Sequence, residues 1–152
     1  SAKVAERLRS HWNRHGPLPV PLWVNLGKSK ITPLDEAEQD YATTMRLLWP
    51  FTTVFVVNVS SPNTPNLREL QNDDGLIRIL EACRAVNQSC ADEHGEAKKP
   101  VLVKVAPDLT DEQLIHVVDT ARSNGADGMV LANTTLARPP SPHPSDLRVF
   151  DE

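Results

Sequence analysis

The sequence predicts an α/β fold built on parallel strands, and two patterns lead to this prediction. Short, nearly continuous apolar runs alternate along the chain with segments that have a helical apolar period. Unbroken apolar runs are typical of parallel strands that are covered on both faces. The length of 152 residues suits one domain, so we expect residues 1–152 to form a single one. The strand spacing fits either a TIM-type barrel or an open doubly wound sheet.

The apolar runs give the expected strands, which are residues 22–24, 54–57, 101–106 and 129–132. A short helix is expected before them, over residues 4–12. Thr32 as N-cap and Pro33 at the first helical position predict the start of the next helix, which carries an apolar stripe to Leu48. Another helix is expected over residues 74–92. The last helix begins at a capping box, Thr110 to Gln113, and ends near Gly125.

Charge, cysteine spacing and missing motifs argue against several kinds of binding site. The net charge is −4 and the basic residues are dispersed, which gives no electrostatic case for nucleic-acid binding. Cys83 and Cys90 would lie about 10 Å apart along a helix, too far for a disulfide, so we expect two partly buried thiols in a reducing compartment. No apolar stretch could span a membrane, and no His, Cys or carboxylate cluster has metal-ligand spacing, so no metal is expected. No Gly-x-Gly-x-x-Gly motif supports dinucleotide binding.

Polar side chains follow the apolar runs, at the ends of strands where α/β proteins bind ligands. Asn25, Asn58 and Asn133 are each the first polar residue after a run, and Lys104 lies within the third run. Each asparagine alone could be an ordinary turn cap, but three at equivalent places suit a neutral heterocycle with N–H and C=O groups. Lys104 could reach solvent from an edge strand, but its apolar neighbours favour a ligand-facing position.

The segment after the second run is rich in uncharged hydrogen-bonding groups, and Ser61 stands out in it because Pro62 restricts it to extended conformations. No histidine and aspartate accompany Ser61, and the Gly-x-Ser-x-Gly elbow is absent, so a serine hydrolase is not expected. Thr64 and Thr135 could be site groups or turn hydroxyls.

Four segments together resemble one enzyme family. They read "VNLGKSK", "VNVSSPNTPNLRELQ", "VLVKVAPDLT" and "ANTT". In this order and spacing they resemble class 2 dihydroorotate dehydrogenase, a flavin enzyme with a TIM-barrel fold. The resemblance covers residues 23–138, and residues 139–152 are expected to form an irregular proline-rich tail. It implies a partial TIM barrel, with four of the family's eight strands.

The resemblance also implies chemistry. The family uses FMN to oxidise dihydroorotate to orotate in pyrimidine synthesis, and class 2 members pass the electrons to a membrane quinone. Ser61 would be the catalytic base that removes a proton from substrate C5. The substrate-binding residues would be Asn58, Ser60, Asn63, Thr64, Asn133 and Thr134. The flavin contacts would be Asn25, Asn58, Lys104 and Ala132, where Ala132 replaces the family's usual Thr or Ser and could contact the flavin only through its backbone.

Parts of the family pattern have no counterpart here, including the flanking strands, the Gly-rich loops for the FMN phosphate and the membrane-docking helices. We therefore expect this chain alone to be inactive, to bind FMN weakly or not at all, and to self-associate through open strand edges. Membrane association would come through parts absent from the chain. Two alternatives stay open: another TIM-barrel enzyme acting on a small heterocycle, and a non-catalytic scaffold that pairs with an intact barrel.

Overall fold

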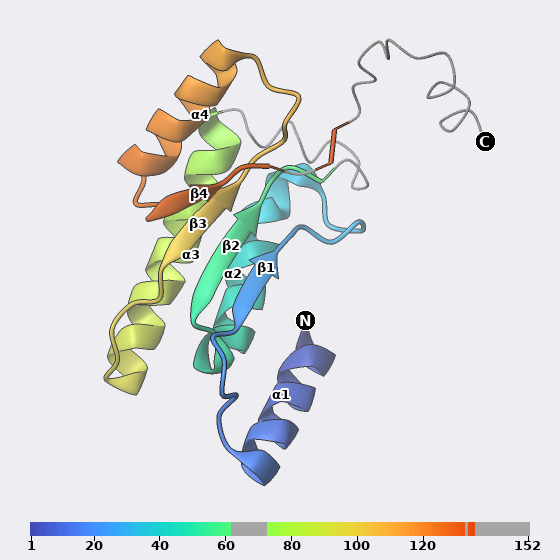
Figure 1. Ribbon diagram of the computed structural model, residues 1–152, viewed down its shortest axis with the longest axis vertical. Coiled ribbons are helices and arrows are strands. Elements are labelled where there is room, and N and C mark those ends of the chain that lie inside the picture. Colours follow the sequence, from blue (N-terminus) through green and yellow to red (C-terminus); the bar gives the residue numbers. More distant parts are fainter. Residues whose placement is uncertain (62–72, 133, 136–152) are drawn as a thin grey trace, which may run out of the picture.

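The computed structural model describes residues 1–61, 73–132 and 134–135 (Figure 1). Helices and strands alternate along the chain. The α-helices are α1 (Ala2–His15), α2 (Ala37–Leu48), α3 (Asp73–His94) and α4 (Asp111–Ser123), and the strands are β1 (Trp23–Leu26), β2 (Val54–Asn58), β3 (Val101–Lys104) and β4 (Gly128–Val130). Two 3₁₀ turns, Leu34–Glu36 and Trp49–Phe51, flank α2.

The strands form one parallel sheet in the order β1-β2-β3-β4. Because each strand lies beside the one that precedes it in the chain, right-handed crossovers place the connecting helices on the same face. A doubly wound sheet reverses its strand order, so the observed order excludes that alternative and fits a barrel. The sheet is not closed, and the prediction of an α/β fold with a half-barrel of parallel strands is confirmed (Figure 1).

The core lies between the sheet and its helices. Phe55, Val57 and Val103 are completely buried on the covered face, where they meet α2 and α3. Those helices pack closely on each other and contribute the stripes that the sequence predicted. The largest buried side chains from α2 and α3 are Tyr41, Met45, Leu76 and Ile79.

The opposite face of the sheet is open, which contradicts the expectation that both faces are covered. The register places Trp23 opposite Val54 on β2 and Asn58 opposite Lys104 on β3, all on this face. Trp23 is 57% exposed, and Asn58 and Lys104 are half-buried. The two faces of the sheet differ in polarity only at a few positions near the strand ends, so the apolar runs are nearly continuous in the sequence.

The start of α2 differs from the prediction. Thr32 does not cap the helix; Pro33 precedes a 3₁₀ turn, and the α-helix begins only at Ala37. The Thr32 hydroxyl instead donates to Asp40 Oδ2 at 3.0 Å, and the Ser29 N–H donates to the same oxygen at 2.6 Å. A carboxylate in the first turn of the helix thus holds the loop and takes the hydroxyl away from the helix end.

The other helices follow the sequence more closely. α4 begins with the predicted capping box, in which Thr110 and Gln113 bond reciprocally, so that prediction is confirmed. Helix α1 is longer than the expected 4–12 segment. Strand β4 ends at Val130, so Leu131 and Ala132 lie beyond it and are exposed.

A buried polar network that the sequence did not reveal joins the 3₁₀ turn after α2, helix α3 and the approach to β3. Trp49 Nε1 donates to Asn87 Oδ1 at 2.9 Å, and Asn87 Nδ2 donates to the Lys99 carbonyl at 2.7 Å. The Lys99 N–H returns a bond to Asn87 Oδ1 at 3.0 Å. Both Trp49 and Asn87 are buried, so these bonds satisfy groups that would otherwise be costly to bury.

Candidate functional site

The carboxyl ends of the strands bring three predicted site residues onto the open face. Asn58 on β2 pairs with Lys104 on β3, and Asn25 on β1 pairs with Val56, two residues before Asn58. Since neighbouring strands lie about 4.8 Å apart and side chains two residues apart share a face, the side chains of these three residues project on the same side. The geometry therefore gathers two amides and one ammonium at one end of the open face.

Asn58 is held firmly from two sides. Its Oδ1 accepts hydrogen bonds from the Ser60 N–H at 3.0 Å and the Ser60 hydroxyl at 2.7 Å, which is the turn-capping role that an asparagine commonly plays after a strand. The Tyr41 hydroxyl donates to the Asn58 carbonyl at 2.7 Å. With Oδ1 occupied, the Nδ2 amide is the part of this side chain that suits a ligand carbonyl.

Tyr41 connects the ends of two strands. Its buried hydroxyl contacts the Lys28 backbone N–H after β1 as well as the Asn58 carbonyl at the end of β2. Burial is the main cause that raises the pKa of the Tyr41 hydroxyl. The hydroxyl therefore stays protonated at neutral pH and keeps donating to Asn58.

Lys104 lies on an interior strand, so the alternative that it reaches solvent from a sheet edge is wrong. Its side chain is half-buried, and the part of the chain that the structure describes offers it no ion-pair partner. The backbone on either side continues the ladder: the Val59 N–H donates to the Lys104 carbonyl at 3.4 Å, and the Val105 N–H to the Val130 carbonyl at 3.3 Å. A cation on a central strand, with no ion-pair partner among the described residues, suits an anionic or electron-rich ligand.

The two serines after β2 differ in their surroundings. Ser60 is completely buried and bonds to Asn58, while Ser61 is half-buried. The predicted substrate role of Ser60 and the catalytic role of Ser61 stay predictions. Three further predicted substrate residues, Asn63, Thr64 and Asn133, lie outside the described residues.

The segment after β4 lies against the loop that follows β3. Ala132 and Thr134 are exposed, and the Thr135 hydroxyl donates to Asp108 Oδ1. This bond joins two loops at the same end of the sheet as Lys104. The predicted flavin contact of Ala132 and the substrate contact of Thr134 are compatible with that position but stay predictions.

Lys28, for which no role was predicted, is only 8% exposed and lies two residues after β1. Its ammonium donates to the Ser29 carbonyl at 2.9 Å and to the Thr32 carbonyl. Lys28 thus folds the loop after β1 back on itself, next to Asn25. The only signal in the sequence was a lysine shortly after an apolar run, which is too common to indicate such a role.

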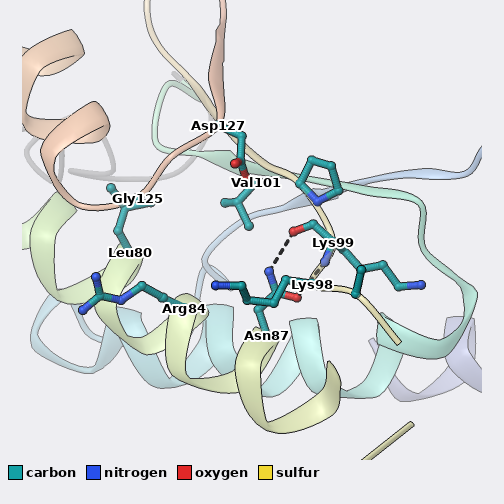
Figure 2. Close-up of a pocket in the computed structure, with 10 residues that line it drawn as sticks. Leu80, Arg84, Asn87, Lys98, Lys99, Val101, Gly125 and Asp127 are labelled. Atoms are coloured by element: carbon teal, nitrogen blue, oxygen red, sulfur yellow. Dashed lines mark hydrogen bonds between the residues drawn. The ribbon is translucent and has the colours of Figure 1, made fainter. Parts of the chain in front are cut away.

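A pocket of about 570 Å³ lies at the opposite end of the sheet (Figure 2). It is bordered by Arg84 and Asn87 of α3, by Lys98 and Lys99 before β3, and by Asp127 before β4. Figure 2 shows the bond from Asn87 to the Lys99 carbonyl on its wall. The amino ends of barrel strands generally serve stability, so we do not assign the candidate site to this pocket.

The described residues form neither a metal-binding cluster nor a membrane-spanning helix. Within the residues that the structure describes, no group of three or more His, Cys, Asp or Glu side chains could hold a metal ion. None of the described helices combines the length and apolarity needed to cross a membrane. Cys83 and Cys90 are both free and buried.

A singly wound parallel sheet, with helices outside and polar groups at the strand ends on the inside, defines a protein of the βα-barrel class. A family profile described as "Dihydroorotate dehydrogenase" matches residues 1–143, a range that includes the 23–138 segment and also helix α1. The chain belongs to the dihydroorotate dehydrogenase family.

Similar proteins agree with this assignment. The chain is 43% identical over 134 residues to "Dihydroorotate dehydrogenase (quinone)" of Thermosynechococcus vestitus, covering 88% of this chain and 35% of that protein. It is 47% identical over 135 residues to the protein of the same name from Kineococcus radiotolerans, covering 89% and 36%. The crystal structure of DHODH from Eimeria tenella in complex with ferulenol superposes with a TM-score of 0.76 at 32% identity, covering 90% of this chain and 39% of that one. The chain thus spans about a third of the length of these curated relatives.

Proposed function

We propose that the complete enzyme to which this chain corresponds oxidises (S)-dihydroorotate to orotate in pyrimidine biosynthesis, with FMN as cofactor and a quinone as final electron acceptor. The observation that carries the proposal is the shared position of Asn25, Asn58 and Lys104 at one end of the open sheet face. A flat ring with carbonyl and N–H groups needs uncharged amides around it, and a ring that gains electrons needs a cation beside it. The relatives are named for this reaction and for a quinone.

The described residues fit the ring portion of a flavin. Lys104 has no carboxylate partner among them, and the Asn58 amide projects beside it. In this proposal Asn25 and Asn58 hydrogen-bond the ring, Lys104 faces its electron-rich edge, and Ala132 contacts it through the backbone. FMN would supply the acceptor for the hydride that leaves substrate C6.

Ser61 would take the proton from substrate C5 while the hydride leaves C6, so that the ring gains one carbon–carbon double bond. A serine hydroxyl is a weak base, and it needs an acceptor that carries its own proton onward. The fixed turn formed by Asn58 and Ser60 gives Ser61 a defined start to its loop. Asn58, Ser60, Asn63, Thr64, Asn133 and Thr134 would bind the pyrimidine ring and its carboxylate.

Quinone reduction and membrane association belong to the complete enzyme in this proposal. The quinone would receive electrons at a surface outside this chain, and peripheral attachment to a membrane would come through segments other than those described. The chain by itself is expected to show no turnover and to retain little or no FMN. A purified 152-residue chain that keeps flavin absorbance through gel filtration would contradict this expectation.

The catalytic role of Ser61 can be tested in the full-length enzyme. Ser61→Ala should lower turnover by about 100-fold or more, because a general base typically contributes that much, while orotate affinity changes little. Turnover is followed by quinone reduction, and orotate affinity by calorimetry. Ser123→Ala, at the exposed end of α4, is the matched control and should leave both quantities unchanged. Turnover near wild type in Ser61→Ala would exclude Ser61 as the base.

The role of Lys104 has a separate readout. Lys104→Ala should weaken flavin retention by about tenfold or more, because it removes a charge-assisted contact. The ratio of flavin to protein absorbance after gel filtration measures retention. Lys98→Ala removes an exposed lysine at the opposite end of the sheet and serves as the control. Equal retention in both variants would remove Lys104 from the flavin site.

A further inference from the structure

The hydrogen-bond ladder between β1 and β2 defines which backbone groups should meet next at the candidate site. The register pairs Trp23 with Val54, and the Leu22 carbonyl accepts from the Val54 N–H at 3.4 Å. Since the backbone groups of parallel strands alternate between the two sides of each strand, this phase turns the Lys28 N–H and the Asn58 carbonyl toward each other. In an unbroken ladder these two groups would bond directly.

A tyrosine hydroxyl lies between them instead. The paired residues of the two strands end at Leu26 and Val57. Beyond that pair, the Tyr41 hydroxyl accepts from the Lys28 N–H and donates to the Asn58 carbonyl at 2.7 Å. A direct bond would hold the nitrogen and the oxygen about 2.9 Å apart, whereas two bonds through a hydroxyl hold them about 4.5–5 Å apart. The hydroxyl therefore spreads the two strand ends by about 2 Å.

The position of this hydroxyl is fixed by the core. The Tyr41 side chain is completely buried and belongs to the cluster of apolar residues between the sheet and its helices. It reaches the strand ends from α2, on the covered face of the sheet. A buried ring in a close-packed core has little freedom to withdraw, so the hydroxyl acts as a spacer of constant length.

The residue before Tyr41 anchors the loop that follows β1. Asp40 Oδ2 accepts from the Ser29 N–H at 2.6 Å and from the Thr32 hydroxyl at 3.0 Å. The Lys28 ammonium closes the same loop by donating to the carbonyls of Ser29 and Thr32. Two consecutive residues of α2 thus hold the loop after β1 and the end of β2 at a set distance from each other.

This distance matters on the open face. Asn25 lies three residues before Lys28, and Asn58 supplies the carbonyl that Tyr41 binds. The side chains of Asn25 and Asn58 both project onto the open face, so the separation of the two amides follows the separation of the strand ends. A displacement of about 1 Å is enough to impair a site that holds a rigid ring.

We propose that Tyr41 is a positioning residue of the flavin site, a spacer that holds the ends of β1 and β2 apart so that Asn25 and Asn58 meet the ring at the required separation. The inference rests on the proposed function. Tyr41 acts through the two asparagines, from the opposite face of the sheet, and not by contact with the ring.

The test is the dissociation constant of FMN from the full-length enzyme, measured by the fluorescence of FMN released on dilution. Tyr41→Phe keeps the ring in the core but removes the bridge, and it should raise the constant about tenfold. Val117→Ala is the control for lost stability, because it shortens a buried side chain of α4, the helix between β3 and β4. It should leave the constant unchanged.

A double-mutant cycle separates positioning from a general loss of stability. In an Asn58→Ala background, Tyr41→Phe should raise the dissociation constant about threefold or less, because one of the amides that it positions is gone. Equal effects of Tyr41→Phe in both backgrounds, or equal constants for Tyr41→Phe and the wild type, overturn the role of Tyr41 and leave the proposed function intact. A wild-type enzyme that holds no FMN overturns the proposed function, and this inference with it.

Discussion

Tyr41 is the residue whose single hydroxyl links the helix layer to the candidate site. It is fully buried, and it donates to the Asn58 carbonyl at 2.7 Å. Tyr41→Phe leaves that carbonyl without this partner in a buried position, so the free energy of unfolding should fall by about 1–3 kcal/mol. Urea denaturation measures the change. Thr43→Ala, on the exposed face of the same helix, is the control and should change stability far less.

Cys83 is the residue that should make stability depend on alkaline pH. Burial raises the pKa of its thiol to about 12. The unfolded thiol has a pKa of about 8.5, so between these values the unfolded state loses its proton first and the folded state loses stability as pH rises. The contribution is fully present below about pH 8.5 and declines by about 1.4 kcal/mol for each pH unit above it.

A variant isolates this effect. Cys83→Ala lacks the thiol, so its stability does not carry this pH dependence. The unfolding free energy of the wild type minus that of the variant should therefore fall by about 2 kcal/mol between about pH 8 and about pH 10. Taking a difference removes the contributions of other groups, including Cys90, whose thiol pKa is also raised by burial. A difference that stays constant over this range would show that the Cys83 thiol does not titrate as proposed.

At the scale of elements, the start of α4 is the clearest case of local control. Thr110 Oγ1 accepts from the Gln113 N–H at 3.2 Å, and the Thr110 N–H donates to Gln113 Oε1 at 3.0 Å. Thr110→Ala should lower the free energy of unfolding by about 1 kcal/mol, because helix N–H groups lose their cap. Because the two side chains cap each other's N–H groups, Gln113→Ala should lower the free energy of unfolding less in the Thr110→Ala background than in the wild type. Additive losses in this double-mutant cycle would contradict the coupling.

The distance in sequence between contacting residues decided how much of the fold could be predicted. The α4 cap involves residues three apart, so the sequence revealed it. The α2 start depends on Asp40, eight residues from Thr32, and the sequence pattern gave no sign that this carboxylate would take the hydroxyl. The network of Trp49, Asn87 and Lys99 spans elements far apart in the chain and was missed for the same reason.

The candidate site was predictable to a similar degree. That Asn25, Asn58 and Lys104 share one end of the sheet follows from their positions after or within apolar runs, once the strands are parallel. The supports beneath them were not predictable. In the sequence, Tyr41 is one more position in a helical stripe and Lys28 is one polar residue after an apolar run, because their roles depend on which strand ends they meet.

For the molecule as a whole, the hydrogen-exchange pattern of the 152-residue chain should follow the strand order. Among the described residues, amide hydrogens of β2 and β3 lie inside the sheet, while those of β1 and β4 border its edges. In hydrogen exchange read by mass spectrometry, residues 54–58 should exchange slowly. Residues 23–26 and 128–130 should exchange faster, because half of their backbone N–H groups point outward from the sheet.

A variant on α3 serves as the control for this measurement. Ala85→Lys replaces an exposed residue of α3 and should retain the wild-type exchange pattern, because α3 packs between α2 and α4. Equal exchange rates in residues 23–26, 54–58 and 128–130 would contradict the prediction. They would mean that the outward N–H groups of β1 and β4 are covered as well as those inside the sheet.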